Sequence, residues 1–372
     1  MINLILPSTE DGVFTKLDNI RDAIFLAGPC PRENYDNDDW RIKEALPYLE
    51  SIGFNGTIIS PTNKYFAKLE GTDVIKKQID WEREAMYKAS VIVFWIDRSE
   101  GRPAFTTNYE VAEWWRKDSI VIGMPQRAIK NDYPKQRLAQ INKQYFETLQ
   151  ETLDAAVKIL NRESEIFFIS DTHFSQQRTL EFSRRPFFDV LDMDLHMISN
   201  WNKKITSNDS VIHAGDFGDL DKMAEIINCL NFKELHLVIG NYERNELDKL
   251  RQVLAGIDRK IYTYKYMFFN DKKTNTQYFI THEPVTEYYQ EAVSQFGNGN
   301  FVTLFGHIHG RAFAKVNGFD LGIDYHNYEP LAIEQVRWFT NAMQYWDENV
   351  FTFEAKYPEK LDNIKYKSIT KK

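Results

Sequence analysis

Short apolar runs separated by amphipathic stretches organise the first 160 residues of the chain. The runs at 23–27, 57–60, 91–96 and 120–123 have the length and β-branched content of buried strands, and helical periodicity fills the gaps between them. Strands that alternate with helices favour a parallel sheet joined by right-handed crossovers, with ligands bound beyond the carboxyl ends of the strands. We therefore expect an α/β protein whose N-terminal part is a doubly wound parallel sheet of the flavodoxin or Rossmann type.

The pattern changes in the second half of the chain. A polar–apolar repeat over 134–161 predicts one long helix that closes the first unit. Further strands are predicted at 166–170, 210–213, 235–239, 261–269, 277–281, 302–305 and 312–316. Because turn-forming residues separate the later strands, we expect hairpins there and an α/β sandwich overall. The predicted divisions are a first domain over 1–162, a second over 163–345 and a charged tail over 346–372.

Composition narrows the class of protein. A chain of 372 residues with 43% hydrophobic and 27% charged residues is an ordinary globular protein, long enough for two domains. No apolar run is long enough to cross a bilayer, so we expect a cytoplasmic protein without a membrane partner. The net charge of −8 makes nucleic acid an unlikely general partner. Cys30 and Cys229 are too few for a disulfide framework or a zinc–thiolate site.

Metal-binding residue types follow the predicted strands of the second domain. They are Asp171 and His173, Asp216, Asn241, His282, and His307 with His309. Residues that leave neighbouring strands at one sheet edge converge on one crevice, and carboxylate, imidazole and amide ligands together suit divalent metals. A single such residue would be an ordinary polar strand end, but the series predicts a dinuclear metal centre.

The order of these motifs, D-x-H, G-D, G-N, H and G-H-x-H, resembles the calcineurin-like metallophosphoesterase superfamily, and in particular its small bacterial and phage branch. The resemblance covers about residues 166–336 and implies two divalent ions, chosen from manganese, iron, zinc or nickel, with manganese expected in vitro. It implies that Asp171, His173, Asp216 and His309 bind one ion, and that Asp216, Asn241, His282 and His307 bind the other. A bridging carboxylate suits two cations about 3.5–4 Å apart that share a hydroxide poised to attack phosphorus, and Asp216 fits that role.

Residues near the predicted centre are open to two interpretations each. The superfamily pattern G-N-H-D/E places a leaving-group histidine where this chain has Tyr242, which we therefore take as a catalytic candidate. Arg184 and Arg185 either grip a substrate phosphate or pair on the surface. His213 either orients Asp216 or is a satisfied strand-end histidine. His196, on the polar side of an apolar stripe, is expected to be solvated.

The first domain carries candidate residues at its strand ends. Gly28 and Pro29 form a tight turn after the first run, Asp97 ends the third, and Glu110 lies near the start of the next predicted helix. Glu82 interrupts an apolar helical stripe, where a charge needs a reason. The structural alternative makes Glu110 a helix-dipole acid, Glu82 a salt-bridged residue and Asp97 a turn former.

Segments FLAGP, QIDWEREAM, VIVFWID, TTNYE and IVIGMP over about 23–125 resemble the nucleoside 2-deoxyribosyltransferase-like family. The resemblance implies that Glu110 attacks the anomeric carbon of a deoxynucleoside, with Asp97 and Glu82 as candidate supporting acids. Gly28, Pro29 and Thr107 are then the expected substrate contacts, and the resemblance implies that a neighbouring subunit of a homo-oligomer completes the pocket.

Together these features predict a bifunctional enzyme that acts on small nucleosides, nucleotides or phosphoesters. A di-metal phosphoesterase would follow a domain that cleaves or transfers N-glycosidic bonds. Two alternatives remain open: an inactive first domain that senses nucleotides, and a nuclease, against which the acidic balance of the chain counts.

Overall fold

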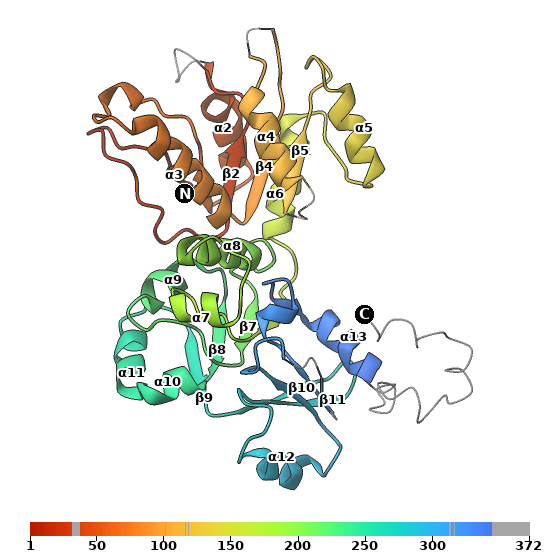
Figure 1. The fold of residues 1–372 in the computed structure, drawn as a ribbon. Coiled ribbons are helices and arrows are strands. Elements are labelled where there is room, and N and C mark those ends of the chain that lie inside the picture. The colour runs from red at the N-terminus through yellow and green to blue at the C-terminus, as the bar shows by residue number, and fades with distance from the viewer. Residues whose placement is uncertain are drawn as a thin grey trace, which may run out of the picture.

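The computed structural model describes residues 1–31, 38–100, 102–115, 117, 119–311, 314–315 and 317–343. These residues form three five-stranded sheets with helices around them, a mixed α/β architecture. The N-terminal elements form one lobe and the remaining elements the other, with helix α8 between them (Figure 1). No helix in these ranges is both long and apolar enough to cross a membrane.

The first sheet is parallel throughout, as the sequence predicts. Its strands β1 (Asn3–Ile5), β2 (Ala23–Ala27), β3 (Thr57–Ile59), β4 (Val91–Trp95) and β5 (Ile120–Gly123) lie in the order β1-β3-β2-β4-β5. The short strand β1 was not predicted. Because the chain runs outward from β2 to β3 and then returns past β2 to β4, the order reverses between β2 and β4. Ligands of doubly wound sheets bind at this point, beyond the carboxyl ends of the two strands.

Helices cover both faces of this sheet. They are η1 (Arg41–Ala45), α2 (Leu46–Ser51), η2 (Phe66–Lys68), α3 (Val74–Lys88), α4 (Phe105–Trp114), α5 (Asp132–Gln140) and α6 (Leu149–Leu160). On one face, Phe25 and Phe94 pack with residues of α3, α4 and α5. On the other, Leu26 and Val93 pack with residues of α2 and α6. Strands β2, β3, β4 and β5 are therefore buried on both sides, which explains their continuous hydrophobic runs.

The predicted single helix over 134–161 is wrong, because two helices occupy that stretch. Asn142 adopts a left-handed backbone with φ 53° after α5, and Thr148 caps α6 by accepting a hydrogen bond from the Glu151 amide at 3.2 Å. Leu138 of α5 packs on one face of the sheet and Leu153 of α6 on the other. The apolar repeat continues from α5 into α6, although the two helices cover opposite faces of the sheet. Periodicity alone cannot reveal this difference.

The second half forms the predicted α/β sandwich. One sheet has the order β15-β6-β7-β8-β9, with β6 (Ile166–Ile169), β7 (Ser210–His213), β8 (Glu234–Val238), β9 (Ile261–Tyr264) and β15 (Leu331–Ala332). The other has the order β10-β11-β12-β14-β13, with β10 (Met267–Asp271), β11 (Thr276–Ile280), β12 (Val302–Phe305), β13 (Ala314–Lys315) and β14 (Gly318–Asp320). Phe168 and Ile212 from the first sheet pack against Tyr278 and Leu304 from the second.

Two strand predictions in this half need correction. The expected strand over 261–269 divides into β9 and β10, which belong to different sheets. Of the expected strand 312–316, only β13 can be described, because 312, 313 and 316 lie outside the described residues. The charged tail over 346–372 also lies outside them.

The remaining helices surround the sandwich. They are α7 (Gln177–Phe182), α8 (Val190–Asn202), α9 (Met223–Cys229), α10 (Asn241–Asn245), α11 (Leu247–Ala255), α12 (Tyr289–Phe296), η3 (Ile323–Tyr325) and α13 (Ile333–Met343). Helix α8 packs against α3 of the first lobe, and its Leu195 is part of the core of that lobe. His196, expected to be solvated, is instead half-buried and lies 3.1 Å from the Tyr87 hydroxyl.

A buried asparagine joins the two lobes through hydrogen bonds. The Asn231 side chain is fully buried and donates from Nδ2 to Ser90 Oγ at 2.7 Å and to the Ile205 carbonyl at 3.0 Å. Its Oδ1 accepts from the Asp22 amide at 3.1 Å. Asn202 adds a bond from its Nδ2 to the Lys88 carbonyl at 3.1 Å. The interface is therefore part of the folded core rather than a loose contact between domains.

Candidate functional sites

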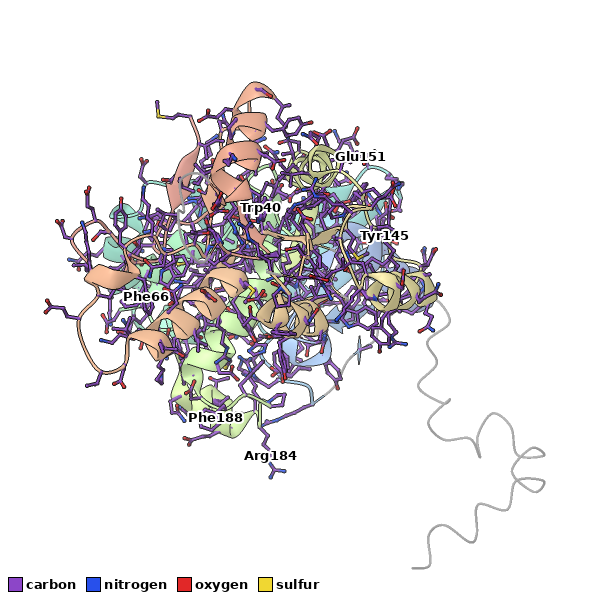
Figure 2. All side chains as sticks on the ribbon, turned by 90° about the horizontal axis from the view of Figure 1, so that it is seen from above. Trp40, Phe66, Tyr145, Glu151, Arg184 and Phe188 are labelled. Carbon is purple, nitrogen blue, oxygen red and sulfur yellow. The ribbon has the colours of Figure 1, made fainter. Side chains whose placement is uncertain are left out.

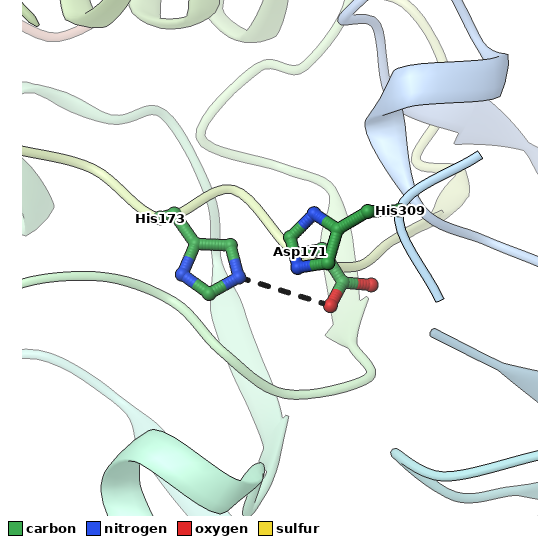
Figure 3. Close-up of side chains that lie close together, drawn as sticks. All are labelled: Asp171, His173 and His309. Atoms are coloured by element: carbon green, nitrogen blue, oxygen red, sulfur yellow. Dashed lines mark ion pairs between the residues drawn. The ribbon is translucent and has the colours of Figure 1, made fainter. Parts of the chain in front are cut away.

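Loops at the carboxyl ends of five strands bring the predicted metal ligands together. Asp171 and His173 follow β6, Asp216 follows β7, Asn241 follows β8, His282 follows β11, and His307 and His309 follow β12. Six of them form two groups of three. One group is Asp171, His173 and His309, the other is Asp216, His282 and His307, and within each group the ligand atoms lie within 4.8 Å of one another. Figure 3 shows the first group, with Asp171 Oδ1 and His173 Nε2 at 3.9 Å.

The Asp216 carboxylate lies between the two groups. Its Oδ2 is 3.5 Å from His173 Nε2 in one group and 3.3 Å from His282 Nε2 in the other. Asn241 Oδ1 completes the second group, at 3.0 Å from His282 Nε2 and 2.9 Å from His307 Nδ1. The arrangement has the form expected of a bridged dinuclear site.

Backbone strain is concentrated at these residues. Asp171, His173, Asp216, His307 and His309 all have positive φ, between 46° and 76°. Residues with a Cβ adopt this conformation at a cost of about 1–3 kcal/mol each, and such residues cluster at functional sites. The fold therefore keeps these side chains in place against local preference.

Two glycines permit the close packing. A Cβ on Gly240 would lie 2.2 Å from Asp216 Oδ1, and one on Gly306 would lie 2.2 Å from Asp171 Oδ2. The two glycines therefore allow the backbone to approach the carboxylates.

The chemistry of the donor atoms fits divalent cations. His173 Nδ1 lies 2.7 Å from Gln176 Oε1 and so carries the proton, which leaves the buried Nε2 with a lone pair and no hydrogen-bond partner among the described residues. His282 likewise uses Nδ1 to donate to the Ala214 carbonyl at 2.9 Å, so its Nε2 faces the oxygens of Asp216 and Asn241. Oxygen and imidazole nitrogen atoms that face one another in a buried site need a positive charge between them, either a metal cation or a proton on an imidazole.

The electrostatics agree with this interpretation. Burial favours the neutral form of His282, but its hydrogen bond to Asp216 and the charges of Asp171 and Asp216 outweigh burial and raise its pKa to about 9. Burial also opposes ionisation of Asp216, yet the contacts with His282 and His173 lower its pKa to about 2. The site thus attracts positive charge.

The first lobe contains a second cluster, beside the point where the strand order reverses. Glu110 on α4 and Glu82 on α3 are both half-buried, and each interacts with the buried Arg41. Arg41 donates to the carbonyls of Leu26 at 2.8 Å and Gly28 at 2.9 Å, which fixes the turn after β2. The structure therefore brings Glu110, Glu82 and the Gly28 turn together.

Burial, and then the charge of Glu82, raise the pKa of Glu110 to about 7, although Arg41 opposes the shift. Burial also raises the pKa of Glu82, whose Oε1 accepts a hydrogen bond from Gln78 at 2.7 Å. Two neighbouring carboxyls with raised pKa values can divide acid and base roles at neutral pH. Among the described residues, none forms a direct ion pair with Glu82. The alternative of a salt-bridged Glu82 is therefore not supported.

Comparison with protein families separates the two lobes in the same way. Residues 165–322 match the calcineurin-like phosphoesterase superfamily domain, and residues 21–128 match the nucleoside 2-deoxyribosyltransferase-like family. The chain therefore carries an N-terminal nucleoside 2-deoxyribosyltransferase-like domain and a C-terminal calcineurin-like phosphoesterase domain. We refer below to the deoxyribosyltransferase-like domain and the phosphoesterase domain.

Similarity to individual proteins adds little. An uncharacterised protein of Methanocaldococcus jannaschii is 32% identical over 84 residues, which are 22% of this chain and 47% of that protein. The chain thus spans about half the length of that relative. The crystal structure of a protein of unknown function from Aquifex aeolicus aligns with 48% of this chain and 100% of its own, at 21% identity and a TM-score of 0.37. Neither similarity bears on function.

The two arginines of the phosphoesterase domain have different surroundings. Arg185 is buried and donates to Asp324 Oδ1 at 2.9 Å, to the Thr172 carbonyl at 2.7 Å and to the Asp171 carbonyl at 2.6 Å. Its donors therefore hold the Asp171 loop and pair with Asp324, which differs from both roles considered for this arginine, a substrate-phosphate contact and a surface ion pair. Arg184 is exposed and points away from the body of the protein (Figure 2).

His213 and Tyr242 also have defined positions. His213 accepts from the Gly215 amide at 3.2 Å and contacts Thr172 Oγ1 at 2.9 Å, so it shapes the loop before Asp216. Burial lowers the pKa of His213 to about 3, which keeps the ring neutral. Tyr242 is half-buried with its ring edge-on to His173, centroids 5.0 Å apart, and its amide donates to Asp216 Oδ1 at 3.0 Å.

The remaining predicted residues of the deoxyribosyltransferase-like domain lie around Glu110 or beyond it. Gly28, Pro29 and Thr107 are buried. Gly28 has φ +149° and packs so closely that a Cβ would lie 2.4 Å from the Trp95 carbonyl. Asp97 is held by the Arg127 guanidinium through bonds of 3.2 and 2.5 Å. The structure therefore gives Asp97 a salt bridge with Arg127.

Three supporting carboxyls were missed from the sequence. Buried Glu243 accepts from the amides of Asp216 at 3.0 Å, Phe217 at 2.6 Å and Gly240 at 3.0 Å, and so joins the loops after β7 and β8. The acidic last position of the G-N-H-D/E pattern could have revealed it. Asp324 Oδ2 lies 3.2 Å from His309 Nδ1. Burial, and then the charge of Asp171, raise the pKa of Asp320 to about 8. Neither of these two aspartates has a sequence signal.

Proposed function

We propose that the chain is a bifunctional, nucleotide-directed enzyme. The phosphoesterase domain belongs to a class of metal-dependent hydrolases, and we infer that it cleaves phosphomonoesters or phosphodiesters with two divalent ions, manganese in vitro. The observation that carries this proposal is the position of Asp216 Oδ2 between the two ligand groups.

Each residue has a defined part in this proposal. Asp171, His173 and His309 would hold one ion, Asn241, His282 and His307 the other, and Asp216 both. When bound, such a pair supplies Lewis-acid activation of the phosphoryl group and a water molecule of lowered pKa. Glu243 and Arg185 keep the ligand loops in place, and Asp324 orients the His309 ring.

Metal analysis of the purified full chain tests the dinuclear site. We expect about two equivalents of Mn²⁺ in the metal-loaded protein, and an Asp216→Ala variant that loses both ions and at least about 100-fold in turnover of an aryl phosphodiester, because one carboxylate serves both ions. Asp221→Ala removes an exposed carboxylate five residues along and is the matched control. Undiminished turnover in Asp216→Ala, or less than one equivalent of metal in the wild type, would overturn the assignment.

For the deoxyribosyltransferase-like domain we propose cleavage or transfer of the N-glycosidic bond of deoxynucleosides or deoxynucleotides. Glu110 would attack the anomeric carbon, with Glu82 exchanging a proton with the departing base or a sugar hydroxyl. The shared burial of the two carboxyls and the effect of the Glu82 charge on the pKa of Glu110 support this assignment. We also propose that Gly28, Pro29 and Thr107 contact the substrate, and that the protein forms a homo-oligomer in which a neighbouring subunit completes the pocket.

Base release from deoxynucleosides, followed by chromatography, tests this second activity. Glu110→Gln should abolish release, whereas Glu113→Gln, which changes an exposed glutamate on the same helix, should retain it. If the wild type releases no base from any deoxynucleoside or deoxynucleotide but binds nucleotides, the alternative of an inactive sensor domain replaces this proposal. Cleavage of DNA in preference to small phosphoesters would instead favour the nuclease alternative, which the net charge of −8 opposes.

A further inference from the structure

A pocket of about 400 Å³ is lined by residues of α4 and α5 in the deoxyribosyltransferase-like domain and lies near the carboxyl ends of β4 and β5. Ile96 and Arg98 enter it from the segment after β4, and Ile122 from β5. Parallel sheets bind ligands at this edge. The volume is within the range of small-molecule sites.

The pocket lies on a different side of α4 from the Glu110 cluster. Its residues from the helix and the position just after it are Asn108, Val111, Ala112 and Trp115, which share one stripe at helical spacing. Thr107, Glu110 and Trp114 form a separate stripe. Glu110 does not line the pocket, so a ligand there would not compete for the candidate nucleophile by direct contact.

The charged groups of the pocket are all cationic. Arg98, Lys130 and Arg137 line it together with Asn108, and among the described lining residues none is acidic. This differs from the chain as a whole, which carries a net charge of −8. A concave surface with several cations and no carboxylate favours an anionic ligand.

Arg98 has donor capacity that the protein does not use. Its NH2 group donates to Asn108 Oδ1 at 2.7 Å, but its Nε is buried without a hydrogen-bond partner among the described residues. No ion pair joins it to a described carboxylate, whereas the nearby Arg127 forms a two-bond pair with Asp97. Burial accordingly lowers the pKa of Arg98. A half-buried guanidinium with unused donors at the edge of a pocket is suited to bind a carboxylate or phosphate.

The rest of the pocket suits a flat ring. Ile96, Val111, Ile122 and Leu138 provide apolar walls, and Trp115 and Tyr133 provide aromatic surface. The Arg137 guanidinium lies 5.2 Å from the Trp115 ring centroid, so a cation already stacks on one aromatic wall. Bases and similar rings bind to such surfaces by stacking.

We propose that this pocket binds an anion that carries a flat aromatic ring, of the class of a nucleoside monophosphate, at a site separate from Glu110. The phosphate would accept hydrogen bonds from Arg98, with Lys130 and Arg137 adding charge, and the ring would pack on Trp115 and Tyr133. The site does not depend on the glycosidic activity proposed above.

Calorimetric titration of the full chain with adenosine 5′-monophosphate tests the site. The measurement uses an Asp216→Ala background, so that the phosphoesterase domain does not hydrolyse the ligand. Arg98→Met should weaken binding at least about tenfold, because it removes the charged donor. Arg127→Met removes a neighbouring arginine outside the pocket and should change affinity less than about twofold. Adenosine and ribose 5-phosphate, each lacking half of the ligand, should each bind at least about tenfold more weakly.

Ala112→Trp provides a second test that leaves every cation in place. Ala112 is exposed on α4, so the larger side chain can fill the pocket without disturbing the core, and it should abolish binding. Equal affinity in the parent, Arg98→Met and Ala112→Trp proteins, or no binding to the parent at millimolar ligand, would overturn the proposal. Adding Glu110→Gln should remove base release and leave this binding unchanged, so failure of the glycosidic proposal can be told apart from failure of this one.

Discussion

Glu110 combines burial with a neighbouring negative charge, and this combination has a consequence for pH dependence. Because a nucleophilic carboxyl must be ionised and the pKa of Glu110 is about 7, base release should rise with pH through a midpoint near 7. Glu82→Gln removes the neighbouring charge and should move that midpoint to lower pH. A pH–rate profile of kcat/KM checks both, with exposed Glu163→Gln as control. A profile that Glu82→Gln leaves unchanged would contradict the coupling.

The same shift affects the stability of the protein. The pKa of Glu110 is higher in the folded chain, at about 7, than its ordinary value of 4.5, so the folded state binds this proton more tightly. The contribution of Glu110 to the free energy of unfolding is therefore fully present below pH 4.5 and is lost as pH rises through 7. Urea unfolding of wild type and Glu110→Gln across that range should differ more at pH 7.5 than at pH 5, with the variant relatively more stable at the higher pH.

Tyr242 occupies a position where the superfamily resemblance suggests a leaving-group histidine. A phenol with an ordinary pKa of about 10 is a poor general acid at neutral pH, and general acid catalysis contributes about 10²- to 10⁴-fold. We therefore expect a preference for aryl phosphates or phosphodiesters, which have acidic leaving groups, over alkyl monoesters. Tyr242→His should narrow that preference in kcat/KM.

Tyr242→Phe separates this chemistry from packing. The ring of Tyr242 is edge-on to His173, so an alternative role is to support that ligand or a bound substrate. If the phenylalanine variant keeps its activity while the histidine variant loses activity equally on both ester types, packing is the role of Tyr242 and the leaving-group argument fails.

At the residue scale, the ligands could be predicted because each follows a strand and has a metal-binding side chain. Their supports could not, since Asp320 and Asp324 follow no motif and act through contacts that only the tertiary fold creates. Arg185 illustrates the same limit. Its sequence context suggested an anion-binding side chain, but the backbone carbonyls of Asp171 and Thr172 occupy its donors.

At the scale of elements, the strands of the doubly wound sheet were predictable because burial on both faces gives each a continuous apolar run. The division between α5 and α6 was not, because both helices are amphipathic and the repeat does not record which face of the sheet each one covers. The division between β9 and β10 was not predicted for a related reason, because neighbouring residues of one apolar run belong to two different sheets.

The buried hydrogen bonds of Asn231 allow a prediction about how much the interface between the lobes stabilises the protein. Asn231→Ala leaves the Ser90 hydroxyl and the Asp22 amide without their partner, and each unsatisfied buried group costs about 1–3 kcal/mol. We expect the free energy of unfolding to fall by about 2–4 kcal/mol. Urea unfolding measures this, with the exposed Asn208→Ala as control. A change in the free energy of unfolding below about 0.5 kcal/mol would show that the hydrogen bonds of Asn231 do not stabilise the interface.

For the whole molecule, the two proposed activities should be chemically independent, because their residues lie in separate lobes. Glu110→Gln should retain phosphoesterase turnover within about twofold, and Asp216→Ala should retain base release to the same extent. Assaying both reactions on both variants checks this. Loss of both activities in either single variant, with the fold intact by circular dichroism, would contradict independence.

Helix α8 has a consequence for the order in which the chain is made. The first sheet and its last helix are complete by Leu160, yet Leu195, which fills part of their core, is synthesised 35 residues later. At about 5–20 residues per second, a ribosome needs about 2–7 s to add that segment, and longer to release it from the exit tunnel. Until α8 is synthesised, the apolar core of the N-terminal lobe lacks the side chain of Leu195. Nascent chains stalled before α8 should therefore be cleaved by proteases and bound by chaperones more readily than the full chain.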